Sequence, residues 1–436
     1  MKGLGLHGLS RNIGATFARQ VFAALVNLIT VVLIARAYGP SGNGVYAVAL
    51  LLPSTLSNFL NMGVGPANVY HLGSNQVTVP ELLGVNLRIF IWLGSIGVAV
   101  GSVVLLGKAE DLFPGVPLSI LWFALAIFPF TLLNSYLQSI FQGLQQFAIF
   151  NRIAVLQPVI LVSIVTVLAI LDNSQFEFLV CAQLLSHSIV LVFILRKLTP
   201  YLNSFQYRGE LVSNTLTYGW KAHLSNILTF VNYKVDVFLI NFFMGPGAVG
   251  VYVIAVAMGE KLWLMSQAVS TVVLPRLSQL SSNESKRKAL TPMLARFVML
   301  VTSIAALALA VIAHWVIQPI FGIAYSSAVL PLLILLPGIV AVAVSRVLAN
   351  DIAARGHPEW NMYSSLVVVV VNLIGNILLI PKYGLAGGAF ATTIAYSLNL
   401  ILRLIIYGRF SGNRWIDSVF VRVSDLKMIR MFVLAR

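Results

Sequence analysis

Charged residues are scarce in this chain. They make up 9% of its 436 residues, whereas an average soluble protein has roughly 25%. Hydrophobic residues reach 59%, and the mean hydropathy is +0.92. This composition excludes an ordinary soluble domain and indicates an integral membrane protein.

Cysteine is almost absent. The single residue, Cys181, excludes a disulfide within the chain and a cysteine-based metal site. No pair of histidines or carboxylates has the spacing of metal ligands. The sequence therefore predicts no metal site and no bound cofactor.

Long polar connections are missing as well. Apolar runs long enough to cross a hydrocarbon core of ~30 Å, about 20 residues each, follow one another along nearly the whole chain. The twelve predicted spans are 12–36, 44–70, 84–106, 117–141, 149–171, 176–197, 212–243, 246–276, 291–321, 326–352, 359–380 and 385–409. Because these runs are continuous, whereas membrane β-strands alternate over about ten residues, they predict helices.

The outer connections between these spans are at most about ten residues long. A membrane glycosyltransferase, ligase or polymerase usually needs a sizeable outer loop with catalytic residues, so the spans argue against these enzymes. The first run contains Arg19 and Arg36 and lacks a small-residue cleavage site, so it predicts a retained helix rather than a signal peptide. We therefore expect a membrane protein that is not an enzyme.

Basic residues outnumber acidic ones by 28 to 13, which gives a net charge of +15. An even number of spans places both termini on one side of the membrane. The basic residues on that side are Lys2, Arg11, Arg88, Arg152, Arg196, Lys197, Arg208, Lys286, Arg287, Lys288, Arg355, Arg409, Arg414, Arg422, Lys427, Arg430 and Arg436. The opposite side has Lys108 and Lys382 beside four acids. Because basic loops stay inside, both termini are expected in the cytoplasm, on the cytoplasmic (inner) membrane. The basic excess then faces anionic lipids rather than nucleic acid.

The chain repeats itself once. The segment LIARAYGPSGNGVYAVA (33–49) matches LINFFMGPGAVGVYVIA (239–255) at an offset of 206, with two glycines, a proline and a tyrosine in register. Each copy joins the first two spans of a six-helix set. The sequence therefore predicts two six-helix lobes, 1–205 and 206–410, related by a pseudo-twofold axis along the membrane normal, and a basic cytoplasmic tail, 411–436.

The seventh predicted span carries a polar stripe. At about 100° per residue, its polar side chains fall in one sector of about 120°. These side chains are Asn214, Thr217, Tyr218, Lys221, Ser225, Thr229, Asn232 and Asp236. Lys234 falls on the opposite face. Because a charged side chain in lipid costs ~2.5 to 3.5 kcal/mol, such a stripe is expected to face a water-filled cavity or other polar helices.

The first span has a matching stripe, which consists of Asn12, Thr16, Arg19, Asn27 and Thr30. At the repeat offset, Arg19 corresponds to Ser225 and Thr30 to Asp236. Further polar residues lie on the second, eighth and tenth spans, namely Asn61, Glu260, Gln267 and Arg346.

Together the stripes predict an electropositive cleft between the two lobes, suited to an anionic or phosphate-bearing amphiphile. Arg19, Lys221 and Arg346 are its predicted substrate-binding residues. Its predicted polar lining is Asn12, Thr16, Asn27, Thr30, Asn61, Asn214, Ser225, Thr229, Asn232 and Gln267. An alternative stays open, in which Lys221 or Lys234 pairs with Asp236 or Glu260 to hold helices together.

Three segments resemble a known family. They are residues 11–73, the segment VDVFLINFFMGPGAVGVYVIAVAMGEKL at mid-chain and FGIAYSSAVLPLLILLPGIV after the ninth span. They are similar to the polysaccharide transporter (Wzx-type) branch of the multidrug/oligosaccharidyl-lipid/polysaccharide (MOP) flippase superfamily. The resemblance implies a V-shaped, MATE-like fold of two lobes with alternating access.

The resemblance also implies a substrate. Such proteins move polyprenyl-diphosphate-linked oligosaccharides, the repeat units of O-antigen, capsule or exopolysaccharide, from the inner to the outer leaflet. Arg19 and Lys221 would attract the diphosphate, and Asp236 and Glu260 are the candidates for coupling to H⁺ or Na⁺. Polysaccharide polymerase and chain-length proteins are the expected partners. The alternative function is a multidrug or small-metabolite exporter of the same superfamily.

Overall fold

The computed structural model describes residues 6–74, 77–172, 175–202, 208–264, 266–267 and 284–420, with side chains from residue 18 onward except those of 221, 222 and 286. All regular secondary structure within these ranges is helical. Nine helices in the same ranges are long and apolar enough to cross a membrane. The predicted fold class, an all-α polytopic membrane protein, is confirmed.

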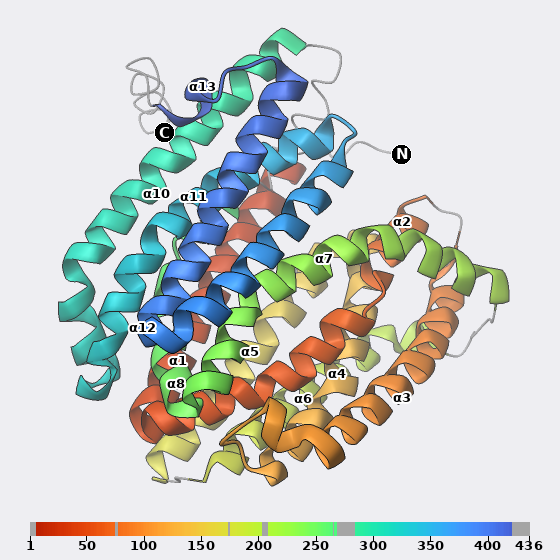
Figure 1. Ribbon diagram of the computed structural model, residues 1–436. Helices are drawn as coiled ribbons and strands as arrows, with labels where there is room; N and C mark the ends of the chain where they lie inside the picture. The colour runs from red at the N-terminus through yellow and green to blue at the C-terminus, as the bar shows by residue number, and fades with distance from the viewer. Residues whose placement is uncertain are drawn as a thin grey trace. The chain divides into compact units, whose positions relative to one another are not determined.

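The chain divides into two compact units, residues 1–253 and 254–436, which we call unit 1 and unit 2. Unit 1 contains α1 (Leu6–Leu60), α2 (Val64–Gly73), α3 (Val79–Leu112), α4 (Leu118–Gly143), α5 (Phe147–Ile170), α6 (Phe176–Leu202), α7 (Gly209–Met244) and the first part of α8 (Pro246–Glu260) (Figure 1). Unit 2 contains the rest of α8, α10 (Glu284–Phe321), the 3-10 helix η1 (Ile323–Ala328), α11 (Val329–Ala354), α12 (Pro358–Ser411) and α13 (Ile416–Val419).

Helix α7 belongs to unit 1 because it packs on α1, α2 and α3. The division between the units therefore falls after the predicted lobe boundary at residue 205. The lobes 1–205 and 206–410 are defined by the sequence repeat and stay a prediction. Of the predicted tail, residues 421–436 lie outside the described residues.

Two long helices each contain two predicted spans. Helix α1 turns at Gly39 and α12 turns at Gly384, where φ is +63° and +57°. Glycine adopts these angles at little cost, and Pro40 and Pro381 beside the turns interrupt the helical hydrogen bonds. The turns separate the first span from the second and the eleventh from the twelfth, as predicted.

The second predicted span, 44–70, is broken in the structure. Helix α1 ends at Leu60, and Met62 and Gly63 have φ of +51° and +67° before α2 begins. A Cβ on Gly63 would lie 2.2 Å from the carbonyl oxygen of Gly219 in α7. Backbone therefore touches backbone at this point, and we call residues 61–63 the α1–α2 break.

The two copies of the Gly-Pro hairpin pack on each other within unit 1. A Cβ on Gly44 would lie 1.7 Å from the carbonyl oxygen of Pro246, and one on Gly250 would lie 1.9 Å from that of Pro40. At the repeat offset of 206 these two contacts are equivalent. Such reciprocity is what a local twofold axis produces.

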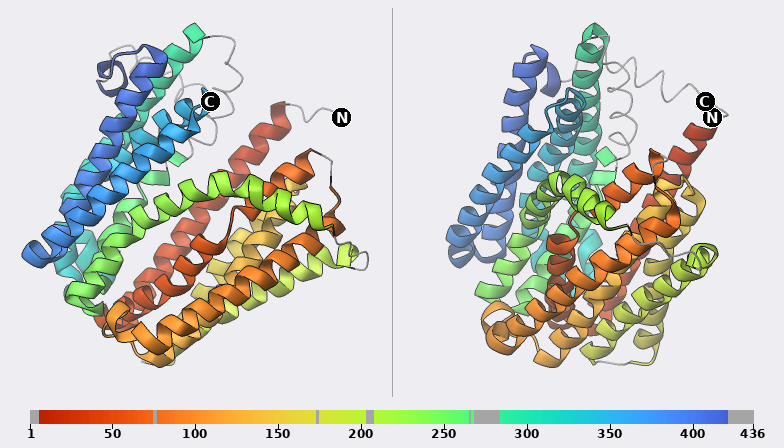
Figure 2. Two further views of the ribbon diagram at one scale, coloured as in Figure 1. Left: turned by 45° about the vertical axis from the view of Figure 1, so that its right-hand side comes forward. Right: turned by 90° about the vertical axis from the view of Figure 1, so that its right-hand side faces the viewer.

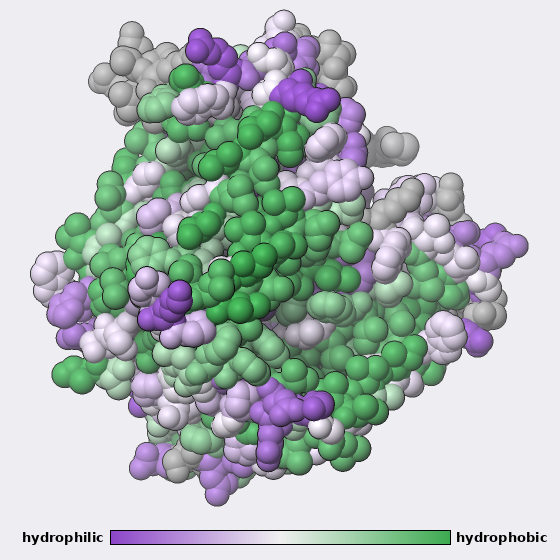
Figure 3. Space-filling model, viewed as in Figure 1, coloured by the Kyte–Doolittle hydropathy of each residue, from purple (hydrophilic) through white to green (hydrophobic). Residues whose placement is uncertain are grey.

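Apolar side chains fill both units and cover their surfaces. The core of unit 1 lies between α2, α3, α4, α5 and α6, and that of unit 2 between α10, α11 and α12. Hydrophobic residues dominate the face in Figure 3, and hydrophilic ones lie mainly toward the edges of the view. Leu106 and Ile170 are 78% and 77% exposed, as expected of side chains that face lipid.

Candidate functional site

Arg19 lies on the first half of α1 and is half-buried. Its guanidinium carbon lies 5.5 Å from the centre of the Phe150 ring of α5, a cation–π contact. The Nε atom is shielded from solvent, and no acceptor in the described part of the chain bonds it. The structure thus keeps an intramembrane guanidinium with unused hydrogen-bonding capacity.

An open polar pocket lies beside Arg19, between α2, α4 and the start of α5. Its volume is about 500 Å³. The lining includes Phe150 and the polar side chains Ser135, Gln138, Ser139 and Gln142. Because Phe150 lines the pocket and its ring also contacts Arg19, the cation and the polar pocket are neighbours.

Asn61 is a second predicted residue near this pocket, because it contacts Ser135 of the lining. Its Nδ2 donates to the Ser135 hydroxyl at 2.8 Å, so the α1–α2 break is tied to α4. Gln138 donates to the Phe150 carbonyl at 3.5 Å. Amide and hydroxyl groups of this kind can hydrogen-bond sugar hydroxyls or phosphate oxygens. The structure therefore brings Arg19 and Asn61 together at one polar site.

The stripe on α7 is exposed at one end and buried at the other. Asn214 and Thr229 are exposed, whereas Asn232 and Asp236 are 7% and 3% exposed. One carboxylate oxygen of Asp236 accepts a hydrogen bond from the fully buried Tyr252 hydroxyl at 2.8 Å, and the other accepts one from the Val237 backbone at 2.7 Å.

Lys234 has different surroundings from Asp236, as the helical angles predicted. It lines an apolar pocket of about 370 Å³ between α1, α3 and α7, with Phe59, Phe230 and Phe238 among its walls. The two charged side chains of α7 that lie two residues apart are thus held in separate environments.

The other predicted residues are scattered. Thr30 is buried and donates to the Val26 carbonyl at 3.0 Å, Ser225 is half-buried, and Asn27 and Gln267 are exposed. The side chains of Asn12, Thr16 and Lys221 lie outside the described residues.

In unit 2, the Arg346 guanidinium lies 4.5 Å from the centre of the Trp263 ring. Glu260 is half-buried at the end of α8. Both residues belong to unit 2. The single cleft predicted from the stripes stays a prediction.

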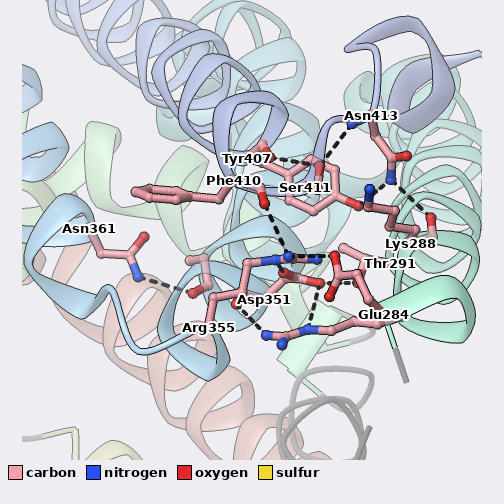
Figure 4. Close-up of polar contacts among 12 residues, drawn as sticks. Glu284, Lys288, Thr291, Asp351, Arg355, Asn361, Tyr407, Phe410, Ser411 and Asn413 are labelled. Atoms are coloured by element: carbon pink, nitrogen blue, oxygen red, sulfur yellow. Dashed lines mark hydrogen bonds and ion pairs between the residues drawn. The ribbon is translucent and has the colours of Figure 1, made fainter. Parts of the chain in front are cut away.

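The sequence did not predict a buried ion network in unit 2 (Figure 4). Asp351, at the end of α11, is fully buried and contacts Arg287 and Thr291 of α10 and Arg355. Arg355 also pairs with Glu284 at 2.7 Å. Burial lowers the pKa of the Arg355 guanidinium, but the bonds to Glu284 and Asp351 outweigh it and hold that pKa above its ordinary value.

The network joins three helices. Arg355 donates to the Phe410 carbonyl at 3.2 Å, which brings in the end of α12. We expected Arg287 and Arg355 to be basic loop residues. The spacing of Asp351 and Arg355, four residues apart on one helix, was the signal that pointed to an ion pair. Its role in the structure is to fasten α10, α11 and α12.

In the described parts of the chain, no group of three histidine, cysteine, aspartate or glutamate residues could hold a metal ion.

The family model described as "Polysaccharide biosynthesis protein" matches residues 33–330. The chain is 25% identical over 233 residues to a Haloferax volcanii protein described as a probable low-salt glycan biosynthesis flippase, a match that covers 52% of this chain and 48% of that protein. The chain thus spans about half the length of the curated relatives it matches.

Solved structures share its fold. The lipid II flippase MurJ in an inward closed conformation gives a TM-score of 0.75 at 15% identity, and the match covers 96% of this chain and 92% of that one. An inward-facing multidrug resistance MATE family transporter of the MOP superfamily gives 0.68 at 16% identity, over 89% and 94% of the two chains. At these identities the likeness shows the fold alone, a two-lobe helical transporter fold.

Proposed function

Because this chain belongs to the polysaccharide biosynthesis protein family, we propose that it is a flippase for a lipid-linked glycan. Its substrate is a polyprenyl-diphosphate-linked oligosaccharide, a repeat unit of O-antigen, capsule or exopolysaccharide. The flippase moves it from the inner to the outer leaflet of the cytoplasmic membrane by alternating access, with both termini in the cytoplasm. Polysaccharide polymerase and chain-length proteins are its proposed partners.

The observation that carries this proposal is the position of Arg19 beside the polar pocket of unit 1. An arginine within an apolar span costs ~2.5 to 3.5 kcal/mol, so a stable place for it needs a compensating role. A guanidinium binds phosphate oxygens through paired N–H groups. Ser135, Gln138 and Gln142 can bond the sugar hydroxyls next to such a phosphate.

Lys221 and Arg346 stay proposed as further cations for the diphosphate. Asp236 and Glu260 stay proposed as groups that couple transport to H⁺ or Na⁺. For Asp236 the support is its burial and its bond to Tyr252, because a buried carboxylate can exchange a proton or a cation as its surroundings change.

A liposome assay tests the function. Purified protein is reconstituted with a fluorescent polyprenyl-diphosphate-linked disaccharide, and its arrival in the outer leaflet is followed with a membrane-impermeant quencher. We expect transport by the wild type and a loss of about 10- to 100-fold in Arg19→Ala, since hydrogen bonds to charged groups contribute ~1.5 to 3 kcal/mol. Arg19→Lys should retain an intermediate rate.

The matched control is Arg36→Ala, an exposed arginine on the same helix α1. It should transport at close to the wild-type rate. A wild-type rate in Arg19→Ala, at normal protein level, would contradict the role of Arg19. Absence of transport by the wild type would contradict the function.

A multidrug or small-metabolite exporter is the second candidate, because a MATE family transporter shares the fold. The same liposomes loaded with a cationic dye separate the two. Dye export without movement of the lipid-linked sugar would favour the exporter.

A further inference from the structure

A large apolar groove lies between α3 and α7 in unit 1. The two helices begin side by side and then diverge (Figures 1 and 2), and residues 84–93 of α3 and 212–216 of α7 contribute to the groove lining. Its volume is about 820 Å³, within the roughly 300–1,000 Å³ of ordinary ligand sites. Its lining includes Met62, Leu87, Ile91, Trp92, Val212 and Leu216.

The groove opens on the outside of α3. Ile91 and Trp92 are 58% and 71% exposed, and Leu87 is 40% exposed. In a membrane, a surface of this kind is in contact with hydrocarbon chains rather than water. Arg88, also exposed, is part of the same lining and is its one charged member among the described residues. A single cation on an apolar groove matches an amphiphile with an anionic head and a hydrocarbon tail.

The groove and the polar pocket meet at the α1–α2 break. Met62 lines the groove, while the neighbouring Asn61 donates to Ser135 in the lining of the polar pocket. The apolar and polar sites therefore both adjoin one short backbone segment, the groove directly at Met62 and the pocket through the bond of Asn61 to Ser135. One molecule with a polar head and an apolar tail can reach both across it.

We propose that the α3–α7 groove binds the prenyl chain of the lipid-linked substrate while its diphosphate and sugars occupy the polar pocket beside Arg19. This rests on the proposed function and adds a route for the tail. Arg88 attracts the diphosphate as the lipid enters the groove from the inner leaflet. The polar head can then cross the break without pulling the tail out of hydrocarbon.

The test compares chain lengths in the liposome assay. Ile91→Trp fills the groove at an exposed position, where a larger side chain leaves the core unchanged. Its transport of the long-chain polyprenyl substrate should fall about tenfold, the effect of losing contact with about two methylene groups. Transport of the same diphosphate-sugar on a short prenyl chain should stay at the wild-type rate, because that chain leaves the blocked part of the groove empty.

Val103→Trp is the matched control, since Val103 is 70% exposed on α3 and lies outside the groove lining. It should transport both substrates normally. The groove assignment would be overturned if Ile91→Trp changed the transport of both substrates by the same factor relative to the wild type. This holds whether both rates stay normal or both fall. A wild type that moves neither substrate would instead contradict the proposed function.

A second measurement uses the wild-type protein and needs no variant. A photoreactive polyprenyl diphosphate should label peptides that contain residues 84–93 and 212–216, and unlabelled polyprenyl diphosphate should compete with it. Labelling confined to other segments would overturn the proposal. Equal labelling by a photoreactive phosphatidylglycerol, without competition by polyprenyl diphosphate, would identify an ordinary lipid contact and would also overturn it.

Discussion

Asp351 has no exposed surface and contacts two arginines that are themselves buried. Asp351→Asn keeps the shape of the side chain but leaves the positive charges of Arg287 and Arg355 without their shared acid. Breaking a buried pair in this way costs ~3 to 5 kcal/mol. We expect a clearly lower midpoint of thermal unfolding for the purified variant in detergent.

Asp111→Asn supplies the control for this measurement. Asp111 pairs with Lys108 at 2.9 Å, but both side chains are more than half exposed. Exposed pairs contribute ~0 to 1 kcal/mol, so this unfolding midpoint should hardly move. Equal midpoints for the two variants would show that the buried network does not fasten α10 to α11 and α12.

Asp236 tests ion coupling at the same scale. Asp236→Asn removes the charge, so transport in liposomes should no longer respond to an imposed H⁺ or Na⁺ gradient. Tyr252→Phe removes only the 2.8 Å hydrogen bond, so this variant should keep the gradient response at a reduced rate. A normal gradient response in Asp236→Asn would transfer the coupling role to Glu260 or to another group.

The helix period alone predicted that Asp236 and Lys234 have different surroundings. It could not predict Tyr252 as the partner of Asp236, because the bond depends on how α7 folds back onto α8. Tyr46, the counterpart of Tyr252, donates to Gln183 at 3.2 Å, so both copies of this tyrosine hold a polar group inside the membrane.

At the scale of elements, the Gly-Pro hairpins permit a sharp prediction. In Gly44→Ala the new methyl group would overlap the Pro246 carbonyl, and the obstacle is backbone that cannot rotate away. We expect a loss of about 3 kcal/mol in stability, and the same loss in Gly250→Ala. The free energy of unfolding in detergent should be lower by this amount in each of the two variants. The double variant should lose less than the sum, because the two glycines are neighbours in one interface between the hairpins.

Gly107→Ala is the control for the hairpin variants. A Cβ at Gly107 on α3 would meet nothing within 4 Å, so alanine should be neutral or stabilising by up to ~1 kcal/mol. A similar loss of stability in this variant would show that the hairpin result reports glycine replacement in general rather than the backbone contact.

The α1–α2 break is a feature that hydrophobic periodicity did not predict. Hydrophobic periodicity predicted an unbroken span through residues 44–70. Gly63 could be seen in the sequence, but its contact with Gly219 joins residues 156 positions apart. Periodicity reports one helix at a time, so a break imposed by a second helix leaves no local signal.

For the whole molecule, length and hydropathy were enough to predict the helical membrane fold, and the quoted segments predicted the family that the comparisons confirm. The ends of most spans lie within a few residues of the observed helices. The packing of α7 into unit 1 was not predicted, since a repeat specifies equivalence between segments but not which segments touch. The polar pocket was also not predicted. Arg19 reaches it through a contact with Phe150 of α5, and Asn61 reaches it through a bond to Ser135 of α4, so no single helix shows it.

The two Gly-Pro hairpins, which are copies of one sequence, pack on each other through equivalent backbone surfaces. Any contact across a twofold axis is self-complementary, so a six-helix subunit with one Gly-Pro hairpin would dimerise through the same backbone surface. Joining two such subunits end to end would preserve that dimer inside one chain. Gly44 and Gly250 would then derive from one glycine by gene duplication. A larger residue at either position would clash with the backbone of the other hairpin copy.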